Sequence, residues 1–311
     1  MTLREVHREV RLGAPFRVDV DAPGRLGDEV LAAVLAEVTR LEAIFDPVDP
    51  ASEFRRWRRG EVTDTLVSTD LAHVLAASER YRVFSKGAFH PGAEPLVRRW
   101  REAERRGLPP TRDEMAELAR SIELPYTAVN GPITRTGDCS GVDLNSIARG
   151  YIVDRALEAG WRLGLASGLC VDAAGDRRHL GASGVEVSLP DLLGVEAEGL
   201  DEPLLLRDAA LSHLSRQDRG FVVGGVRYGD LLDPSTGWPS EGVAAVATLA
   251  PDAMTADVLA TVIGVGRLPA GGGLPGCAWL AVTADGRVLR STGWPRVGGT
   301  TSAAPAADRS R

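Results

Sequence analysis

The chain has 311 residues, with 36 Lys and Arg against 43 Asp and Glu, and a formal net charge of −7. Hydrophobic residues make up 44% and charged residues 25% of it, which is typical of a globular protein with a substantial core. The acidic excess argues against binding to nucleic acid or to an anionic membrane, because such binding depends on neutralising phosphates.

The three cysteines lie far apart, at Cys139, Cys170 and Cys277, and no two form a CxxC pair. This spacing predicts neither a disulfide framework nor a zinc site, so we expect buried thiols in a reducing compartment. The first residues contain no apolar h-region, and no stretch approaches the ~18 apolar residues of a membrane span. We therefore expect a cytoplasmic protein without a signal peptide.

The first half of the chain is predicted to be mainly helical. Alternation of apolar and polar residues predicts a strand over residues 14–21. Apolar residues at helical spacing predict helices over residues 27–45, 71–84, 95–105 and 111–121. The arginine-rich stretch 98–106 is interpreted as a solvated helix face.

The second half is predicted to consist mainly of strands and glycine turns, interrupted by two helices. The segments read as strands are LGLASGLCV, VEVSL, PLLLRDAALS, GFVVGGVRYGDLLD and GVAAVATLA. The helices are expected over residues 146–160 and 254–265, and a final hairpin turns at Asp285-Gly286. Strands dominating one half and helices the other favour an α+β fold over a regular βαβ alternation. We expect one domain over residues 1–297 and a disordered tail over residues 298–311.

The segment DAMTADVLATVIG, residues 252–264, contains the clearest local pattern for a ligand site. Asp257 and Thr261 are four residues apart on a predicted helix, so their side chains share one face. A carboxylate and a hydroxyl one turn apart can both reach Mg²⁺, which prefers oxygen ligands. Such a pair also arises by chance, but here it lies among apolar residues, and a buried lone Asp needs a partner.

The segment VDLNSIARGYIVD, residues 142–154, gives a second candidate. Asp143 and Asn145 precede Ser146, a plausible helix start whose free N–H groups suit a phosphate. Arg149 would then lie in the first turn, where a cation opposes the helix dipole and would serve a ligand anion. Ordinary N-capping is the alternative interpretation.

Two further segments carry acids beside turns. In YGDLLDPSTGWP, Asp230 would be a general base and Asp233 a residue that fixes the turn, although each could equally be a solvated loop acid. In CVDAAGD, Gly175 would let the backbone approach a ligand closely, although structural turns use the same residues.

Together these segments resemble, in their order and spacing, the ApbE family of FAD:protein FMN transferases, over about residues 10–293. The family blocks of MGT, SELSRLN, GAFDPTVGPL, DLGGIAKGYAVD, NAGGD, HIIDPRTGYP and DAMxADALATA type are matched by residues 12–14, 52–58, 87–96, 143–154, 172–176, 230–239 and 252–262. The last two blocks are the specific ones.

The resemblance implies a T-fold-like α+β architecture with two lobes around a nucleotide cleft. It implies that FAD is cleaved with the help of Mg²⁺, that FMN is attached to a threonine of a target flavoprotein, and that AMP is released. The metal would be held by the Asp257 carboxylate, the Thr261 hydroxyl and the Ser146 carbonyl. The residues expected to contact the flavin nucleotide are Leu12, Ala88, Phe89, His90, Asp143, Arg149, Asp172 and Gly175.

The chain departs from the family pattern at several of these positions. The family histidine before IIDP is Asp230 here, and His90 replaces an acid in the GAFDP-type block. We expect Asp230 or His90 to act as the base. Asp172 replaces the asparagine of NAGGD and Leu12 the family methionine. These departures leave two alternatives to transfer: FAD hydrolysis without an acceptor, and a nucleotide-binding accessory protein that has lost catalysis.

Overall fold

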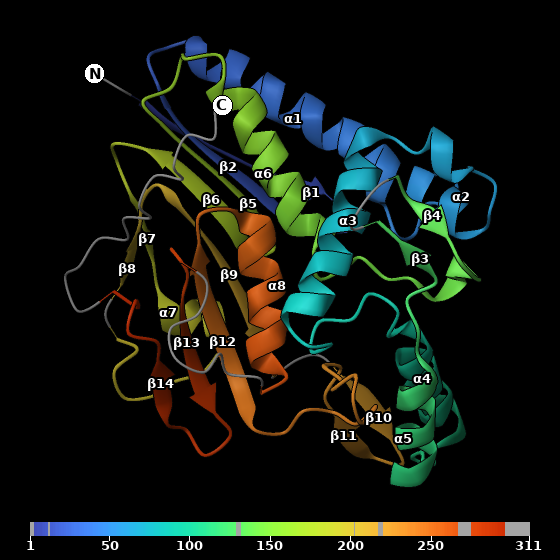
Figure 1. The fold of residues 1–311 in the computed structure, drawn as a ribbon. Coiled ribbons are helices and arrows are strands. Elements are labelled where there is room, and N and C mark those ends of the chain that lie inside the picture. Colours follow the sequence, from blue (N-terminus) through green and yellow to red (C-terminus); the bar gives the residue numbers. More distant parts are fainter. Residues whose placement is uncertain are drawn as a thin grey trace.

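The computed structural model describes residues 3–11, 13–128, 132–201, 203–216, 220–266 and 275–295. An eight-stranded sheet forms its centre, with the order β1-β2-β5-β6-β9-β12-β13-β14 and antiparallel pairing throughout (Figure 1). Its strands are β1 (Leu3–Arg11), β2 (Ala14–Ala22), β5 (Gly168–Ala173), β6 (Asp176–Gly181), β9 (Ala209–Ser215), β12 (Val243–Ala250), β13 (Ala278–Thr283) and β14 (Val288–Arg290).

Three helices cover one face of this sheet: α1 (Leu26–Phe45), α6 (Ala148–Trp161) and α8 (Ala253–Gly264) (Figure 1). Ten of the twelve residues of α8 are buried, because it is packed against both the sheet and α6. A helix that is apolar on nearly all sides requires such burial. Any polar side chain on α8 is therefore carried into the interior.

The opposite face of the sheet carries the short helix α7 (Leu189–Leu193) and the hairpin of β7 (Val185–Val187) and β8 (Leu204–Leu206). Alternation along β9 divides its side chains between the two faces. Leu211 packs in the core cluster that contains Leu193, whereas its neighbour Ala210 packs in the cluster beneath the helices.

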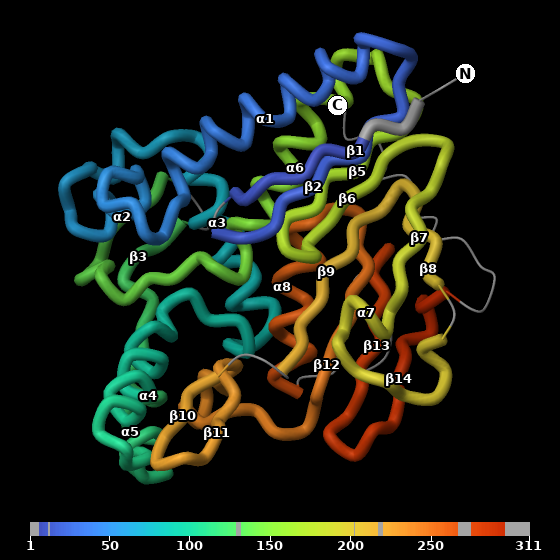
Figure 2. Tube along the Cα trace, turned by 180° about the vertical axis from the view of Figure 1, so that it is seen from behind, coloured from blue at the N-terminus to red at the C-terminus, as the bar shows by residue number. Residues whose placement is uncertain are grey.

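The remaining elements lie to one side of the sheet (Figures 1 and 2). They are α2 (Glu53–Arg58), α3 (Thr69–Phe84), α4 (Glu94–Arg106), α5 (Arg112–Ser121), β3 (Tyr126–Thr127), β4 (Thr134–Arg135), β10 (Phe221–Val223), β11 (Val226–Tyr228) and the 3₁₀ turns η1 (Asp64–Leu66) and η2 (Cys139–Gly141). Trp100 of α4 packs against Phe221, Tyr228 and Trp238, with ring centroids 4.9–5.8 Å apart. This aromatic cluster joins segments more than a hundred residues apart.

The mixed helix–strand fold agrees with the prediction. The strand predicted over residues 14–21 is β2, and the predicted helices correspond to α1, α3, α4, α5, α6 and α8. Strands β1 and β6 and helices α2 and α7 were not predicted, and the tail over residues 298–311 lies outside the described residues. Within the described part of the chain, no helix has the length and apolarity to cross a membrane.

The pairing of β9 leaves space beside one of its ends. Strand β6 pairs with β9 only from Ala209 to Leu211, whereas β12 pairs with β9 from Ala210 to Ser215. Among the described residues, the last part of β9 therefore has a strand on one edge only. The cavity described next opens at this point.

Candidate functional site

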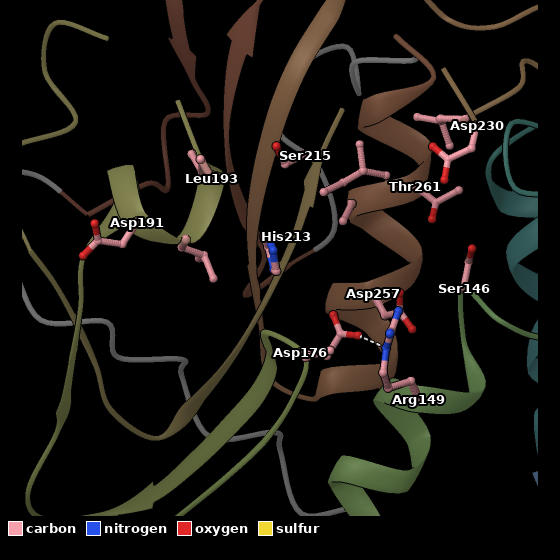
Figure 3. A pocket seen from close by; sticks show the side chains of 16 residues that line it. Ser146, Arg149, Asp176, Asp191, Leu193, His213, Ser215, Asp230, Asp257 and Thr261 are labelled. Carbon is pink, nitrogen blue, oxygen red and sulfur yellow. Dashed lines mark hydrogen bonds and ion pairs between the residues drawn. The ribbon is translucent and has the colours of Figure 1, made fainter. Parts of the chain in front are cut away.

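A cavity of about 390 Å³ lies between the start of α6, the inner face of α8, the end of β9 and α7 (Figure 3). The residues that line it are Ser146, Arg149, Ala174, Asp176, Asp191, Leu192, Leu193, Gly194, His213, Leu214, Ser215, Asp230, Leu231, Asp257, Ala260 and Thr261. Five predicted site residues, namely Ser146, Arg149, Asp230, Asp257 and Thr261, thus come together from three separate segments.

Helices α6 and α8 cross closely beside the cavity because α6 has a glycine at the crossing. A Cβ on Gly150 would lie 2.6 Å from the carbonyl carbon of Ala253 and 2.7 Å from the Cα of Met254. One turn further along α6, the buried Asp154 carboxylate accepts hydrogen bonds from the N–H groups of Ala253, at 2.8 Å, and Met254, at 2.9 Å. These contacts fix the start of α8 relative to α6.

Asp257 lies at the centre of the cavity wall and is 6% exposed. Its Oδ2 atom is buried and has no hydrogen-bond partner among the described residues. Burial and the nearby Asp176 carboxylate raise the pKa of Asp257 well above its usual value, while Arg149 opposes that shift. A buried carboxylate oxygen without a partner is costly, so this atom requires a proton or a cation.

Arg149 and Asp176 form an ion pair beside Asp257, with Nε 2.5 Å from Oδ2 (Figure 3). The other oxygen of Asp176 accepts a hydrogen bond from the Ser212 hydroxyl. Arg149 is on α6, Asp176 begins β6 and Ser212 is on β9, so the network ties three elements together. One guanidinium thus faces two buried carboxylates.

The donors present fit a hard divalent cation. Thr261 lies one helical turn beyond Asp257, and Ser146 precedes the first turn of α6; all three line the cavity. A carboxylate oxygen, a hydroxyl and a backbone carbonyl are oxygen ligands of the kind that Mg²⁺ prefers. No group of three or more His, Cys, Asp or Glu side chains in the described ranges is arranged to hold a metal. The set that fits is therefore mixed, and its single carboxylate is the one with the unpartnered oxygen.

The predicted helix start at Ser146 is two residues early. Helix α6 begins at Ala148, and its N-cap residue Ile147 makes no side-chain cap hydrogen bond. Asp143 instead accepts a hydrogen bond from the Asn145 N–H, at 2.8 Å, which fixes the preceding turn. The local geometry therefore assigns Asp143 to the turn and leaves the start of α6 without a capping side chain.

His213 is the only imidazole among the described residues that line the cavity. Its ring lies against Gly175, which has a φ of +93°, and a Cβ on residue 175 would clash with ring atoms Cε1 and Nδ1. The Nδ1 atom is buried without a hydrogen-bond partner in the described part of the chain. Burial lowers the pKa of His213 below its usual value, so the ring is neutral at pH 7.

Asp172 lies on the other face of the sheet. It is directly opposite Arg177 in the β5–β6 ladder and forms an ion pair with it at 2.9 Å. The same carboxylate accepts a hydrogen bond from the Gly175 N–H, at 2.7 Å, and so fixes the β5–β6 turn. Asp172 lines a second cavity, of about 400 Å³, with Arg17 and Asp19. Its contact with the first cavity is thus indirect, through the turn and Gly175.

Four other predicted site residues do not line the cavity, and a fifth lies outside the described residues. Ala88 and Phe89 are buried in the main core, 5% and 3% exposed. His90 accepts a hydrogen bond from the Gly92 N–H through Nδ1, and burial lowers its pKa to about 4. Asp143 is in the turn before α6, and Leu12 lies outside the described residues.

Sequence reasoning missed four polar residues of the cavity: Asp176, Asp191, His213 and Ser215. Asp176 ends the matched DAAGD block, which was a usable signal. His213 is one of five histidines and lies in a strand with no neighbouring motif, so its position followed only from strand pairing. Asp191 belongs to the unpredicted helix α7.

Comparison with known proteins finds that the chain is similar to one family. The model of the ApbE family matches residues 12–273. A protein of Haemophilus influenzae named FAD:protein FMN transferase is 26% identical over 249 residues, which is 75% of this chain and 70% of that protein. A Treponema pallidum protein of the same name is 29% identical over 197 residues, 57% of this chain and 54% of that protein.

Two solved structures have folds similar to that of this chain. The crystal structure of the ApbE protein of Thermotoga maritima has a TM-score of 0.73 and 26% sequence identity, covering 93% of this chain and 97% of that chain. The flavinyl transferase ApbE of Pseudomonas stutzeri has a TM-score of 0.71 at 18% identity, covering 94% and 96% of the two chains. At that identity the second likeness concerns the fold alone.

Proposed function

The chain belongs to the ApbE family, and on that premise we propose that it is a Mg²⁺-dependent FAD:protein FMN transferase. It would cleave the pyrophosphate of FAD, attach FMN to a threonine hydroxyl of an acceptor flavoprotein, and release AMP. The names of its curated relatives, which are transferases, support this activity. The single observation that carries the proposal is the unpartnered Asp257 oxygen in a cavity with further oxygen donors.

Asp257, Thr261 and the Ser146 carbonyl would hold the metal. When bound, Mg²⁺ supplies charge neutralisation at the pyrophosphate. Arg149 contributes a second, fixed positive charge on the same wall and is held in place by Asp176. Because Asp154 and Gly150 fix α8 against α6, the donors on α8 and the one just before α6 are positioned before the substrate arrives.

Asp230 is the candidate base for the acceptor hydroxyl. It is an exposed residue of the cavity lining, after β11, where a side chain of another protein can reach it. A carboxylate can accept the hydroxyl proton as the oxygen attacks phosphorus, although it is a weaker base than an imidazole. His90, the other predicted base, does not line this cavity, so Asp230 is the better candidate.

The test is to incubate the purified protein with FAD and MgCl₂ and to measure AMP by chromatography, with and without an acceptor flavoprotein. We expect AMP release that requires Mg²⁺, together with a covalently fluorescent acceptor band on a denaturing gel. An acceptor with its threonine replaced by valine is the matched control. AMP without a labelled acceptor would establish hydrolysis instead. FAD binding without AMP would establish the accessory role, which the replacement of the family histidine by Asp230 favours.

A further inference from the structure

The cavity has more negatively than positively charged side chains, which disfavours the binding of an anionic substrate. Among the described residues that line it, four are aspartates and Arg149 is the only permanent cation. That guanidinium is already engaged by Asp176 at 2.5 Å. Two phosphate charges entering such a site meet strong repulsion unless further positive charge is supplied. A metal held by Asp257 would supply part of that positive charge.

His213 is the only other described lining residue able to become positively charged. Figure 3 shows its ring between the α7 wall, with Asp191, and the α8 wall, with Asp257. We propose that His213 is a substrate-binding residue that takes up a proton when the diphosphate of the nucleotide enters, and then donates a hydrogen bond to it as an imidazolium. The inference rests on the proposed function, because it takes the FAD diphosphate as the ligand.

The position of the ring supports this role. The edge with Cε1 and Nδ1 lies against the backbone of Gly175, so the ring is held at a fixed place by a residue that has no side chain. A larger residue at position 175 would displace it. The charged groups around the ring are Asp172 of β5, Asp176 and Arg177 of β6, and Asp191 of α7.

The empty and loaded sites differ in which protonation state they favour. Burial lowers the pKa of His213 in the free protein, which leaves the imidazole uncharged at pH 7. A negative charge close to the ring stabilises the protonated form, because the Coulomb attraction is strong in a partly buried site. When the diphosphate binds, the His213 ring should therefore favour its protonated form. The diphosphate itself stays fully ionised between pH 6 and 8, so it does not contribute a proton of its own.

The affinity for FAD should therefore depend on pH. As pH rises from 6 to 8, the contribution of His213 to FAD affinity should fall, by up to about tenfold per pH unit for one proton taken up. Asp257 acts in the opposite sense, because a carboxyl with a raised pKa releases its proton when a cation binds. Comparison of wild type with a His213 variant cancels the Asp257 contribution, which both proteins share.

The experiment is isothermal titration calorimetry of FAD in the presence of MgCl₂, at pH 6, 7 and 8, in buffers of different ionisation enthalpy. Relative to wild type, His213→Gln should take up close to one proton fewer and bind FAD more weakly at pH 6, with a smaller difference at pH 8. His213→Lys carries a permanent charge, so it should bind at pH 8 at least as tightly as wild type and with little pH dependence. Circular dichroism checks that both variants are folded.

The matched control is His73→Gln. His73 is also an imidazole whose pKa is lowered by desolvation, but it is an exposed residue that stacks on Tyr151 in a different cavity. The His73→Gln variant should take up as many protons on FAD binding as wild type. Equal proton uptake by wild type and His213→Gln would overturn the inference and leave the proposed function intact. Failure of wild type to bind FAD at any of these pH values would overturn both.

Discussion

Arg149 and Asp176 meet at 2.5 Å on the wall of the cavity, although they lie on different elements and belong to different sequence blocks. The pair stands beside Asp257, and the Arg149 guanidinium is the group that offsets the repulsion between the two carboxylates. Removing one partner of a buried ion pair leaves an uncompensated charge, which is costly.

Because the Arg149 side chain is partly exposed, we expect Arg149→Met to lower the free energy of unfolding by about 1.5–3 kcal/mol, the range for a hydrogen bond to a charged group. Asp176→Asn should also destabilise, and the double variant should lose less than the sum of the two single changes. Urea unfolding of the four proteins at pH 7 gives the coupling energy. Additive losses would show that the pair is not energetically coupled.

We expect Asp257 to lower the stability of the free protein, although it is required for metal-dependent FAD binding. In the free protein its buried oxygen has no partner among the described residues, so Asp257→Asn should raise the free energy of unfolding by about 1–3 kcal/mol. The same change should abolish the effect of Mg²⁺ on FAD titrations. Asp285→Asn, in an exposed turn, is the control and should change neither property. An Asp257→Asn protein with normal Mg²⁺-dependent FAD binding would contradict the metal assignment.

The hydroxyl of Thr261 can be tested with a pair of variants that keep its volume or its chemistry. Thr261→Val preserves shape but removes the oxygen, whereas Thr261→Ser keeps the oxygen. We expect Thr261→Val to weaken the apparent Mg²⁺ affinity in FAD titrations by about tenfold, the low end of the effects reported for groups supporting a metal. Thr261→Ser should stay within about threefold of wild type, by the same scale. Equal behaviour of the two variants would remove Thr261 from the metal site.

Gly150 should be essential to the crossing of α6 and α8. An added methyl group would lie 2.6–2.7 Å from the backbone of Ala253 and Met254, and neither helix can give way without moving the Asp154 contacts. Gly150→Ala should therefore destabilise by about 1–3 kcal/mol and weaken Mg²⁺-dependent FAD binding. Gly242→Ala, where nothing lies within 4 Å of the added atom, is the matched control. Thermal unfolding and FAD titration of both variants check this.

His90 should make the protein sensitive to acid. Burial holds its folded-state pKa at about 4, against 6.5 for the unfolded chain. Its contribution to stability is complete above pH 6.5 and is lost as pH falls from 6.5 towards 4, up to about 3 kcal/mol in total. His90→Gln should flatten the decrease in urea-unfolding free energy between pH 7 and pH 4. An unchanged pH dependence would show that His90 does not titrate with folding.

Local periodicity was enough to predict most helices and two of the three proposed metal ligands. Asp257 and Thr261 were found because a helix places residues four apart on one face, and α8 keeps that spacing. Strand β6 was missed because its residues, DRRHLG, lack apolar alternation. Its arginine side chains are instead paired with acids on other elements, such as Arg178 with Asp154 at 3.0 Å.

The sequence by itself determined the family and the mixed helix–strand fold, because these depend on short-range spacing and ordered motifs. It also predicted the oxygen donors of the proposed metal site. Only the tertiary structure decided which acids face the cavity. Asp172 and Asp176 are four residues apart, yet the β5–β6 turn and the alternation of the sheet direct them to opposite faces. Strand pairing likewise brought His213 to the cavity wall, a position that no local pattern around it predicts.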